Sequence, residues 1–130
     1  MVKKIDMKKV IHTEHAPKAI GPYSQAIEAN GMLFISGQIP VDPATGKVPE
    51  GIEAQTEQVL KNVAAILKEA GYGFDNVIKT TCLLSDIANF KAMNEVYAKY
   101  YTKDCPARAA FAVKDLPMGV LVEIETIAAK

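Results

Sequence analysis

Hydrophobic and polar positions alternate along two short runs near the start of the chain, and the runs meet at Asn30-Gly31. An Asn-Gly pair between two strand-like runs is the strongest short-range signal for a β-hairpin with a two-residue turn. The predicted turn pairs Ala29 with Met32. Counting outward from it, one face of the hairpin carries a mostly polar set: Tyr23, Gln25, Phe34, Ser36 and Gln38.

The apolar positions then change to the spacing of a helix. Residues 39–51, IPVDPATGKVPEG, contain three prolines and predict a loop. From residue 52 to residue 70 apolar side chains recur every three or four positions, and Gly71 follows as a typical helix end. The apolar stripe of this predicted amphipathic helix consists of Ile52, Val59, Val63, Ile66, Leu67 and Ala70.

A strand and a second helix follow in the pattern. Residues 76–86, NVIKTTCLLSD, are rich in β-branched side chains and predict a strand. Ser85 or Asp86 can cap a helix that we expect to continue through Tyr101. Its apolar stripe has the spacing typical of core positions rather than of a cofactor site. That stripe consists of Ile87, Phe90, Met93, Tyr97 and Tyr100.

Residues 108–128 contain two alternating runs joined by LPMG, which predicts a second hairpin. The order of elements favours an α+β fold, a mixed β-sheet with two helices on one face. In the last run Glu123 and Glu125 point the same way. A hairpin loop of two or four residues places Arg108 on that face as well, whereas an odd loop reverses this.

Composition limits the classes of function. A chain of 130 residues with 49% hydrophobic composition predicts one domain spanning residues 1–130. Fifteen basic and fifteen acidic side chains cancel, so the chain lacks the charge typical of a nucleic-acid or membrane-surface protein. Cys82 and Cys105 match no metal-binding spacing, and no leader or membrane-length run is seen, so we expect a cytoplasmic protein with free thiols.

Arg108 is the only arginine of the chain, and alanines flank it. One interpretation is a salt bridge with Glu125 across the predicted hairpin. The other is a site for a small carboxylate, which the planar guanidinium holds through two parallel hydrogen bonds while a nearby glutamate acts on the adjacent atom. The spacing leaves both interpretations open.

Four stretches resemble the RidA family, also called YjgF-type reactive intermediate or imine deaminases. In chain order these stretches are AIGPYSQAI (19–27), FISGQIPVDPATG (34–46), NEVYAKYY (94–101) and PARAAFAVKDLPMGVLVEI (106–124). They occur in the same order as in the family, so the resemblance extends over nearly the whole chain. The resemblance implies a chorismate-mutase-like homotrimer with sites in clefts between subunits.

The resemblance also implies an activity and the residues that carry it. Family members hydrolyse reactive 2-imino acids, formed from enamines that pyridoxal-phosphate-dependent dehydratases release, to 2-oxo acids and ammonia. By position, Arg108 holds the substrate carboxylate and Glu123 activates water. The cleft is lined by Tyr23, Ser36, Gly37 and Asn94. No metal or organic cofactor is expected. Many relatives carry a cysteine where this chain has Ala110, so the resemblance does not support thiol chemistry here.

Two other functions compete with deamination. A carboxylate-binding or chaperone-like stress protein could use the same cleft without turnover, but the presence of both Arg108 and Glu123 favours an enzyme. Ribonuclease activity or inhibition of translation is another role attributed to the family. A net charge of zero and a single arginine make strong RNA binding unfavourable, because such binding depends on clustered cations.

Overall fold

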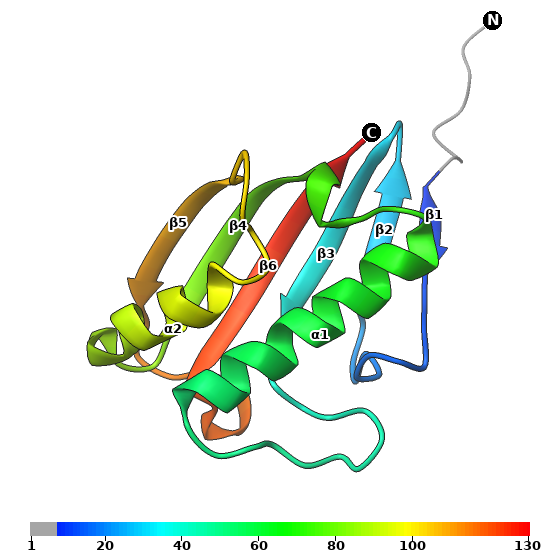
Figure 1. Cartoon of the computed structure of the whole chain (residues 1–130). Coiled ribbons are helices and arrows are strands. Elements are labelled where there is room, and N and C mark those ends of the chain that lie inside the picture. Colours follow the sequence, from blue (N-terminus) through cyan, green and yellow to red (C-terminus); the bar gives the residue numbers. More distant parts are fainter. Residues whose placement is uncertain (1–7) are drawn as a thin grey trace, which may run out of the picture.

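The computed structural model describes residues 8–130 as a six-stranded sheet with two helices packed on one face (Figure 1). The strands lie in the order β1-β2-β3-β6-β4-β5. Their bounds are β1 (Lys9–Ile11), β2 (Ala26–Ala29), β3 (Met32–Gln38), β4 (Val77–Leu84), β5 (Ala107–Ala112) and β6 (Val122–Ala129). The predicted mixed sheet and α+β class are confirmed; residues 1–7 of the predicted domain lie outside the described part.

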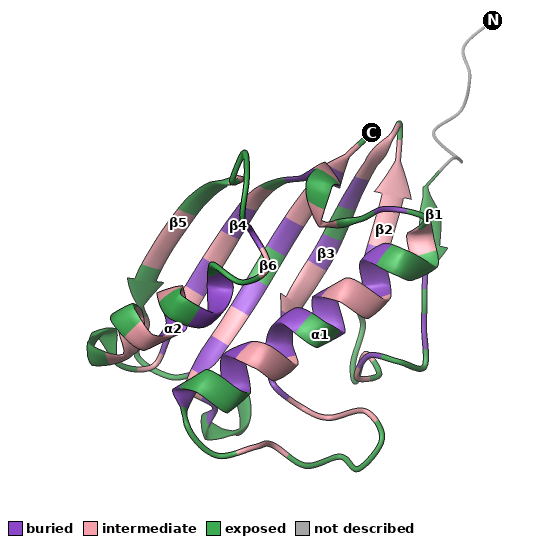
Figure 2. Ribbon diagram, in the orientation of Figure 1, coloured by how far each residue is buried: buried purple, intermediate pink, exposed green. Residues whose placement is uncertain are grey.

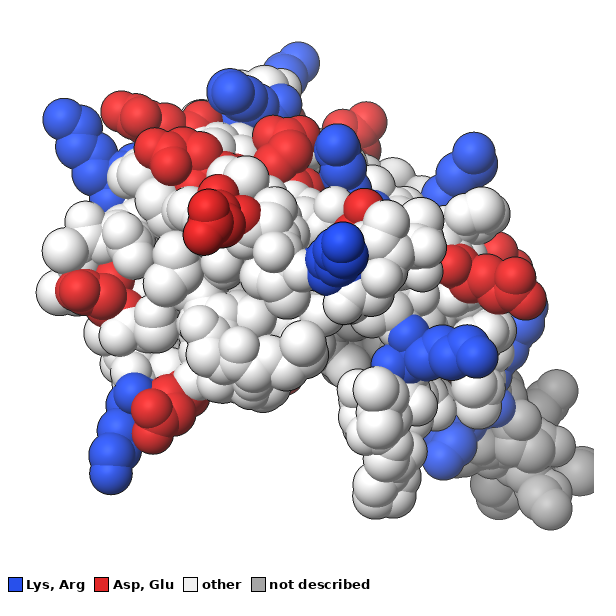
Figure 3. Space-filling model, turned by 90° about the horizontal axis from the view of Figure 1, so that it is seen from below, with Lys and Arg blue, Asp and Glu red and all other residues white. Residues whose placement is uncertain are grey.

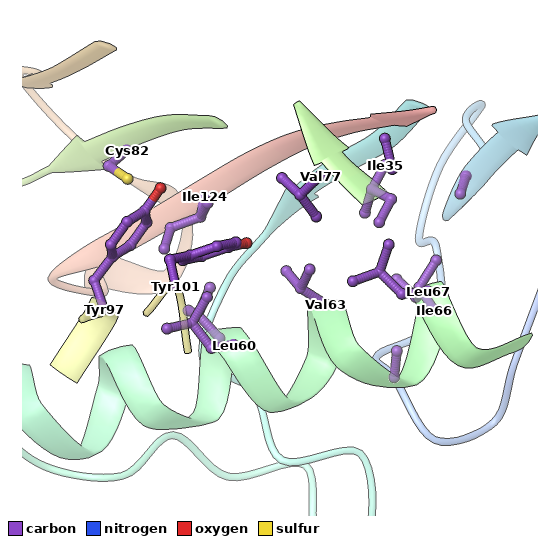
Figure 4. Close-up of a cluster of buried hydrophobic side chains, with 14 of the residues drawn as sticks. Ile35, Leu60, Val63, Ile66, Leu67, Val77, Cys82, Tyr97, Tyr101 and Ile124 are labelled. Atoms are coloured by element: carbon purple, nitrogen blue, oxygen red, sulfur yellow. The ribbon is translucent and has the colours of Figure 1, made fainter. Parts of the chain in front are cut away.

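The long helix α1 (Ile52–Ala70) has the bounds that the apolar spacing predicts. It ends at Gly71, whose left-handed backbone lets its N–H reach the carbonyls of Leu67 and Lys68. Figure 4 shows Leu60, Val63, Ile66 and Leu67 rising from α1 toward the strands. Burying each such side chain stabilises the fold by about 1.5 to 3 kcal/mol, which fixes α1 across the middle of the sheet.

The second helix is shorter than predicted. Asp86 accepts a hydrogen bond from the Ala88 N–H, but the turn that it caps is a 3₁₀ helix, η3 (Ile87–Asn89). The helix α2 runs only from Phe90 to Tyr97. After it, the N–H groups of residues 100 and 101 both bond to the Tyr97 carbonyl. The predicted helix through Tyr101 is therefore wrong at both ends, because tighter turns replace its first and last parts.

The first hairpin is confirmed, with Ala29 opposite Met32. Its predicted polar face needs one correction. A register shift lies between Ile35 and Gln38 of β3, and Gln38 pairs with Ile124, a fully buried residue. Paired residues point to the same face, so this β-bulge turns Gln38 into the helix-covered core. Ser36 and Gly37 lie within the bulge.

The second predicted hairpin is wrong. β5 and β6 are not neighbours, because β4 lies between them. β4 and β5 are joined by a crossover that includes α2, and they run parallel as such a connection requires. Before β6, the chain forms a short 3₁₀ helix, η4 (Pro117–Gly119), and returns to the centre of the sheet. There β6 bonds to β3 on one side and β4 on the other.

The two faces of the sheet differ in burial. Along β6 every second residue is buried under the helices, and the residues between them face the uncovered side (Figure 2). This uncovered face presents large apolar side chains, including Val10 at 58% exposure, Phe34 at 44% and Phe111 at 48%. The lower end of the molecule carries scattered Lys, Arg, Asp and Glu side chains on an otherwise uncharged surface (Figure 3). Within residues 8–130 we find no helix that is both long and apolar enough to cross a membrane.

Candidate functional site

Arg108 lies on the edge strand β5 and is held by α2. Its Nη1 donates a 2.7 Å hydrogen bond to Asn94 Oδ1. Its Cζ lies 4.9 Å from the centroid of the Tyr97 ring and 5.5 Å from that of Phe90, both within the range of a cation–π contact. The side chain remains exposed. The only guanidinium of the chain is thus oriented by three side chains but left accessible to a ligand.

An open cavity of about 500 Å³ adjoins this arginine. It is lined by Asn94, Tyr97, Ala98, Tyr101, Cys105, Pro106 and Arg108. Aromatic rings and small side chains make most of the wall, and the guanidinium supplies a positive charge. Such a cavity suits a small carboxylate with an apolar side chain. Tyr97, which the sequence indicates as a core residue, also forms this wall together with Tyr101.

Glu123 lies on β6 and points to the uncovered face of the sheet. It packs against the bulge of β3: a Cβ added at Gly37 would lie 2.9 Å from Glu123 Cδ and still closer to Oε2. Partial burial, and then the nearby Glu125 carboxylate, raise the pKa of Glu123 above that of an ordinary glutamic acid. A carboxyl of this kind is suited to accept and return a proton.

Ser36 lies beside Gly37 in the bulge of β3. Ser36 Oγ donates a 2.6 Å hydrogen bond to the Ser24 carbonyl, which ties the bulge to the residue after Tyr23. The Tyr23 hydroxyl accepts a 3.4 Å bond from the Ile20 N–H, and the ring is 53% exposed. Gly37 thus contacts Glu123, Ser36 adjoins Gly37 along the chain, and Tyr23 precedes the residue that Ser36 bonds.

The prediction that Arg108 and Glu123 share one face of the sheet is wrong. Arg108 pairs with Thr80, a fully buried residue of the helix-covered face. Glu123 pairs with Leu83, which lies an odd number of residues from Thr80 and so points to the opposite face. For the same reason the alternative salt bridge between Arg108 and Glu125 is wrong. The predicted residues therefore divide into two candidate half-sites on opposite faces, one around Arg108 and one around Glu123.

The other candidate ligands and nucleophiles lie elsewhere. Cys82 is fully buried, and burial raises its thiol pKa to about 11, so it is a core residue rather than a nucleophile. A larger cavity of about 660 Å³ lies between α1 and residues 13–15, away from all six predicted residues, with His15 in its wall. Among residues 8–130 no three His, Cys, Asp or Glu side chains are grouped for metal binding.

Comparisons with known proteins agree with the resemblance found in the sequence. The family model described as "Endoribonuclease L-PSP" matches residues 13–130. The chain is 58% identical to a RutC family protein of Pyrococcus horikoshii over 95% of this chain and 99% of that protein. It is 50% identical to the 2-iminobutanoate/2-iminopropanoate deaminase of Mus musculus over 94% and 91% of the two chains.

A solved structure supports the same relationship. The crystal structure of E. coli TdcF with bound serine matches with a TM-score of 0.92 and 41% identity, over 95% of this chain and 99% of that chain. The relatives thus match in sequence and in three-dimensional fold.

Proposed function

This chain belongs to the endoribonuclease L-PSP family, also called YjgF/RidA, and from that premise we propose that it hydrolyses 2-imino acids to 2-oxo acids and ammonia. The substrates would be the imine products of pyridoxal-phosphate-dependent dehydratases, such as 2-iminobutanoate and 2-iminopropanoate. The observation that carries the proposal is the Glu123 carboxyl, which is half-buried against Gly37 with a raised pKa. A relative that is half identical bears this activity in its name.

The proposed reaction needs a bidentate hydrogen-bond donor and a general base. Arg108 holds the substrate carboxylate through two N–H donors, which places carbon 2 at the base. Water attacks carbon 2 of the protonated imine, and Glu123 takes the proton that the water loses. The C–O bond forms first, giving a carbinolamine. Glu123 then returns the proton to nitrogen, the C–N bond breaks as the C=O double bond forms, ammonia leaves, and Glu123 takes up the proton of the hydroxyl group. No electron is transferred to or from the substrate.

The two half-sites support a site shared between copies of the chain. Since Arg108 and Glu123 project from opposite faces, a small molecule cannot touch both within one copy. A contact between the β5 edge of one copy and the uncovered face of the next would bring them together. Such a contact joins different surfaces and closes into a ring. The apolar side chains on that face, Val10, Phe34 and Phe111, would be covered by the same contact.

We therefore expect a homotrimer in dilute buffer, the ring size that the resemblance implies. Light scattering coupled to size exclusion should give three times the chain mass of 14.1 kDa. Phe34→Asp would place a charge in the predicted contact, so this variant should dissociate and lose activity together. A monomeric wild-type protein that remained fully active would contradict the shared site.

Gly37→Ala tests how the Glu123 carboxyl is held. The backbone at Gly37 is not left-handed, so alanine is tolerated there, but its Cβ would collide with the carboxyl of Glu123. We expect at least a tenfold loss of kcat/KM, since a displacement near 1 Å can cost about 10²-fold, with little change in melting temperature. Gly73→Ala is the control, because nothing lies within 4 Å of a Cβ there. Equal activity in Gly37→Ala and Gly73→Ala would show that Glu123 does not take part in the reaction.

The pH profile tests the raised pKa of Glu123. A general base must be ionised, so kcat/KM should fall as pH drops through that pKa, above the usual value of about 4.3 for glutamate. Glu125 is one of the two causes of the shift. Glu125→Gln should therefore move the acid limb of the profile to lower pH while leaving the neutral plateau in place. If the acid limb did not move, it would reflect the titration of a group other than Glu123.

A coupled assay separates deamination from the alternatives. A pyridoxal-phosphate-dependent dehydratase generates the imine from threonine or serine, and formation of the 2-oxo acid is followed with and without this protein. Acceleration above the uncatalysed rate is the expected result. Binding of 2-oxobutanoate without acceleration would instead indicate a binding protein. Cleavage of a single-stranded RNA by the same preparation would favour the activity in the family description.

A further inference from the structure

One stripe of α2 lies directly beneath the Arg108 guanidinium. Phe90, Asn94 and Tyr97 are spaced by four and three residues, so their side chains share one face of the helix. All three contact Arg108: the rings at 5.5 and 4.9 Å from Cζ, and the Asn94 amide through the 2.7 Å bond to Nη1. The spacing indicates only a core stripe in the sequence, but in the structure the stripe is a platform for the arginine.

Tyr97 is itself fixed to the sheet. It is 7% exposed, and its hydroxyl shares a buried 2.7 Å hydrogen bond with Thr80 Oγ1. Thr80 is the register partner of Arg108 on the adjacent strand. The Tyr97 ring also lies 4.4 Å from the Tyr101 ring, centroid to centroid. Figure 4 shows Tyr97 reaching from α2 toward the strand that carries Cys82. The ring below Arg108 is therefore held by β4 and by its neighbouring ring.

An exposed arginine otherwise has many rotamers, and binding a carboxylate would cost the loss of that freedom. Stacking on fixed rings holds the guanidinium plane, and Asn94 takes one of its five N–H donors. Within residues 8–130 its other N–H donors make no hydrogen bond, so they can bind a ligand. We propose that Tyr97, assisted by Phe90, is a positioning residue that orients Arg108 for the substrate carboxylate. This inference rests on the proposed function, and it makes Asn94 a partner of Arg108 rather than a direct substrate contact.

Because the chain has a single arginine, its guanidinium can be observed alone. In protein labelled with ¹⁵N-arginine, the wild type should show slow rotation of the guanidinium, with separate Nη signals. Tyr97→Leu should merge these signals. Tyr97→Phe keeps the ring and should keep them separate. This measurement needs no substrate and reports on Arg108 rather than on general stability.

The matched binding test uses 2-oxobutanoate as a probe, measured by calorimetry. Tyr97→Leu should weaken binding about fivefold, the scale of one lost cation–π contact, and should raise KM more than it lowers kcat. Tyr97→Phe should restore most of the affinity. Phe74→Leu is the control: Phe74 packs on Tyr101, 5.2 Å between centroids, whereas within residues 8–130 the rings that contact Arg108 are those of Phe90 and Tyr97. It should cost stability without weakening binding.

The outcomes separate the two proposals. Unchanged Nη signals and unchanged affinity in Tyr97→Leu would overturn the positioning role, as would an equal loss of affinity in Phe74→Leu. A wild-type protein without imine turnover would overturn the proposed function, while the ¹⁵N signals would still decide whether Tyr97 orients Arg108.

Discussion

Glu123→Gln should lower kcat for imine hydrolysis by about 10²- to 10⁴-fold, the usual contribution of a positioned general base. The amide keeps the shape of the side chain against Gly37 but cannot accept the proton of the attacking water. Binding of 2-oxobutanoate should remain within a fewfold of the wild type, because Arg108 still holds the carboxylate. Single-turnover kinetics and calorimetry on the same preparation measure the two quantities.

Glu125→Gln is the internal control for this experiment. Glu125 lies two residues along the same strand, points the same way and is more exposed. Its substitution should leave kcat at neutral pH within about twofold, since only general-base catalysis contributes the larger factors. If Glu125→Gln were the damaging change, the assignment of the base would be displaced by two residues.

Glu123→Gln should not be less stable than the wild type. A carboxyl whose pKa is raised in the folded state contributes stability below its unfolded pKa, and this contribution is lost as pH rises through the folded pKa. Above that range the ionised Glu123 destabilises the fold, so Glu123→Gln should melt at an equal or higher temperature at neutral pH. Below about pH 4 the difference should vanish. Loss of activity with retained stability would identify a chemical role.

Arg108→Lys should lower kcat/KM at least tenfold. Lysine keeps the positive charge but loses the two-pronged donor, the bond to Asn94 and the flat stack on Tyr97 and Phe90. A lost charge-assisted hydrogen bond costs about 1.5 to 3 kcal/mol, and each 1.4 kcal/mol is a factor of ten. Steady-state kinetics with the dehydratase-generated imine, alongside the melting temperature, measures the effect.

The matched control is Lys79→Arg on the neighbouring strand. Lys79 pairs with Ala107, beside Arg108, but points to the other face. If a guanidinium on either face near the edge of the sheet were sufficient, Arg108→Lys with Lys79→Arg would restore the rate. We expect the double variant to remain as slow as Arg108→Lys. A fully active Arg108→Lys protein would show that the guanidinium does not hold the substrate.

Locally encoded elements of this fold can be predicted from the sequence. The Asn30-Gly31 turn and α1 depend on contacts between residues a few positions apart, so the turn residues and the apolar spacing are sufficient. The face of Glu123 follows from simple alternation along β6. The sequence also singles out Arg108, because arginine occurs once.

Strand pairing is not encoded in this way. β5 and β6 follow one another with a turn-rich connection, yet β6 inserts between β3 and β4, where both of its edges are hydrogen-bonded. The position of β6 depends on pairing across the whole sheet, so a local sequence pattern assigns Arg108 to the wrong face. The bulge at Gly37 and the aromatic platform of α2 likewise depend on partners distant in the sequence.

The placement of Arg108 and Glu123 on opposite faces has a genetic consequence. In a ring of copies, each proposed site would combine the arginine of one chain with the glutamate of the next. Two inactive alleles, one altered at Arg108 and one at Glu123, would then complement each other, since a mixed ring regains an intact pair at one boundary. Two chains that each carry both changes would not.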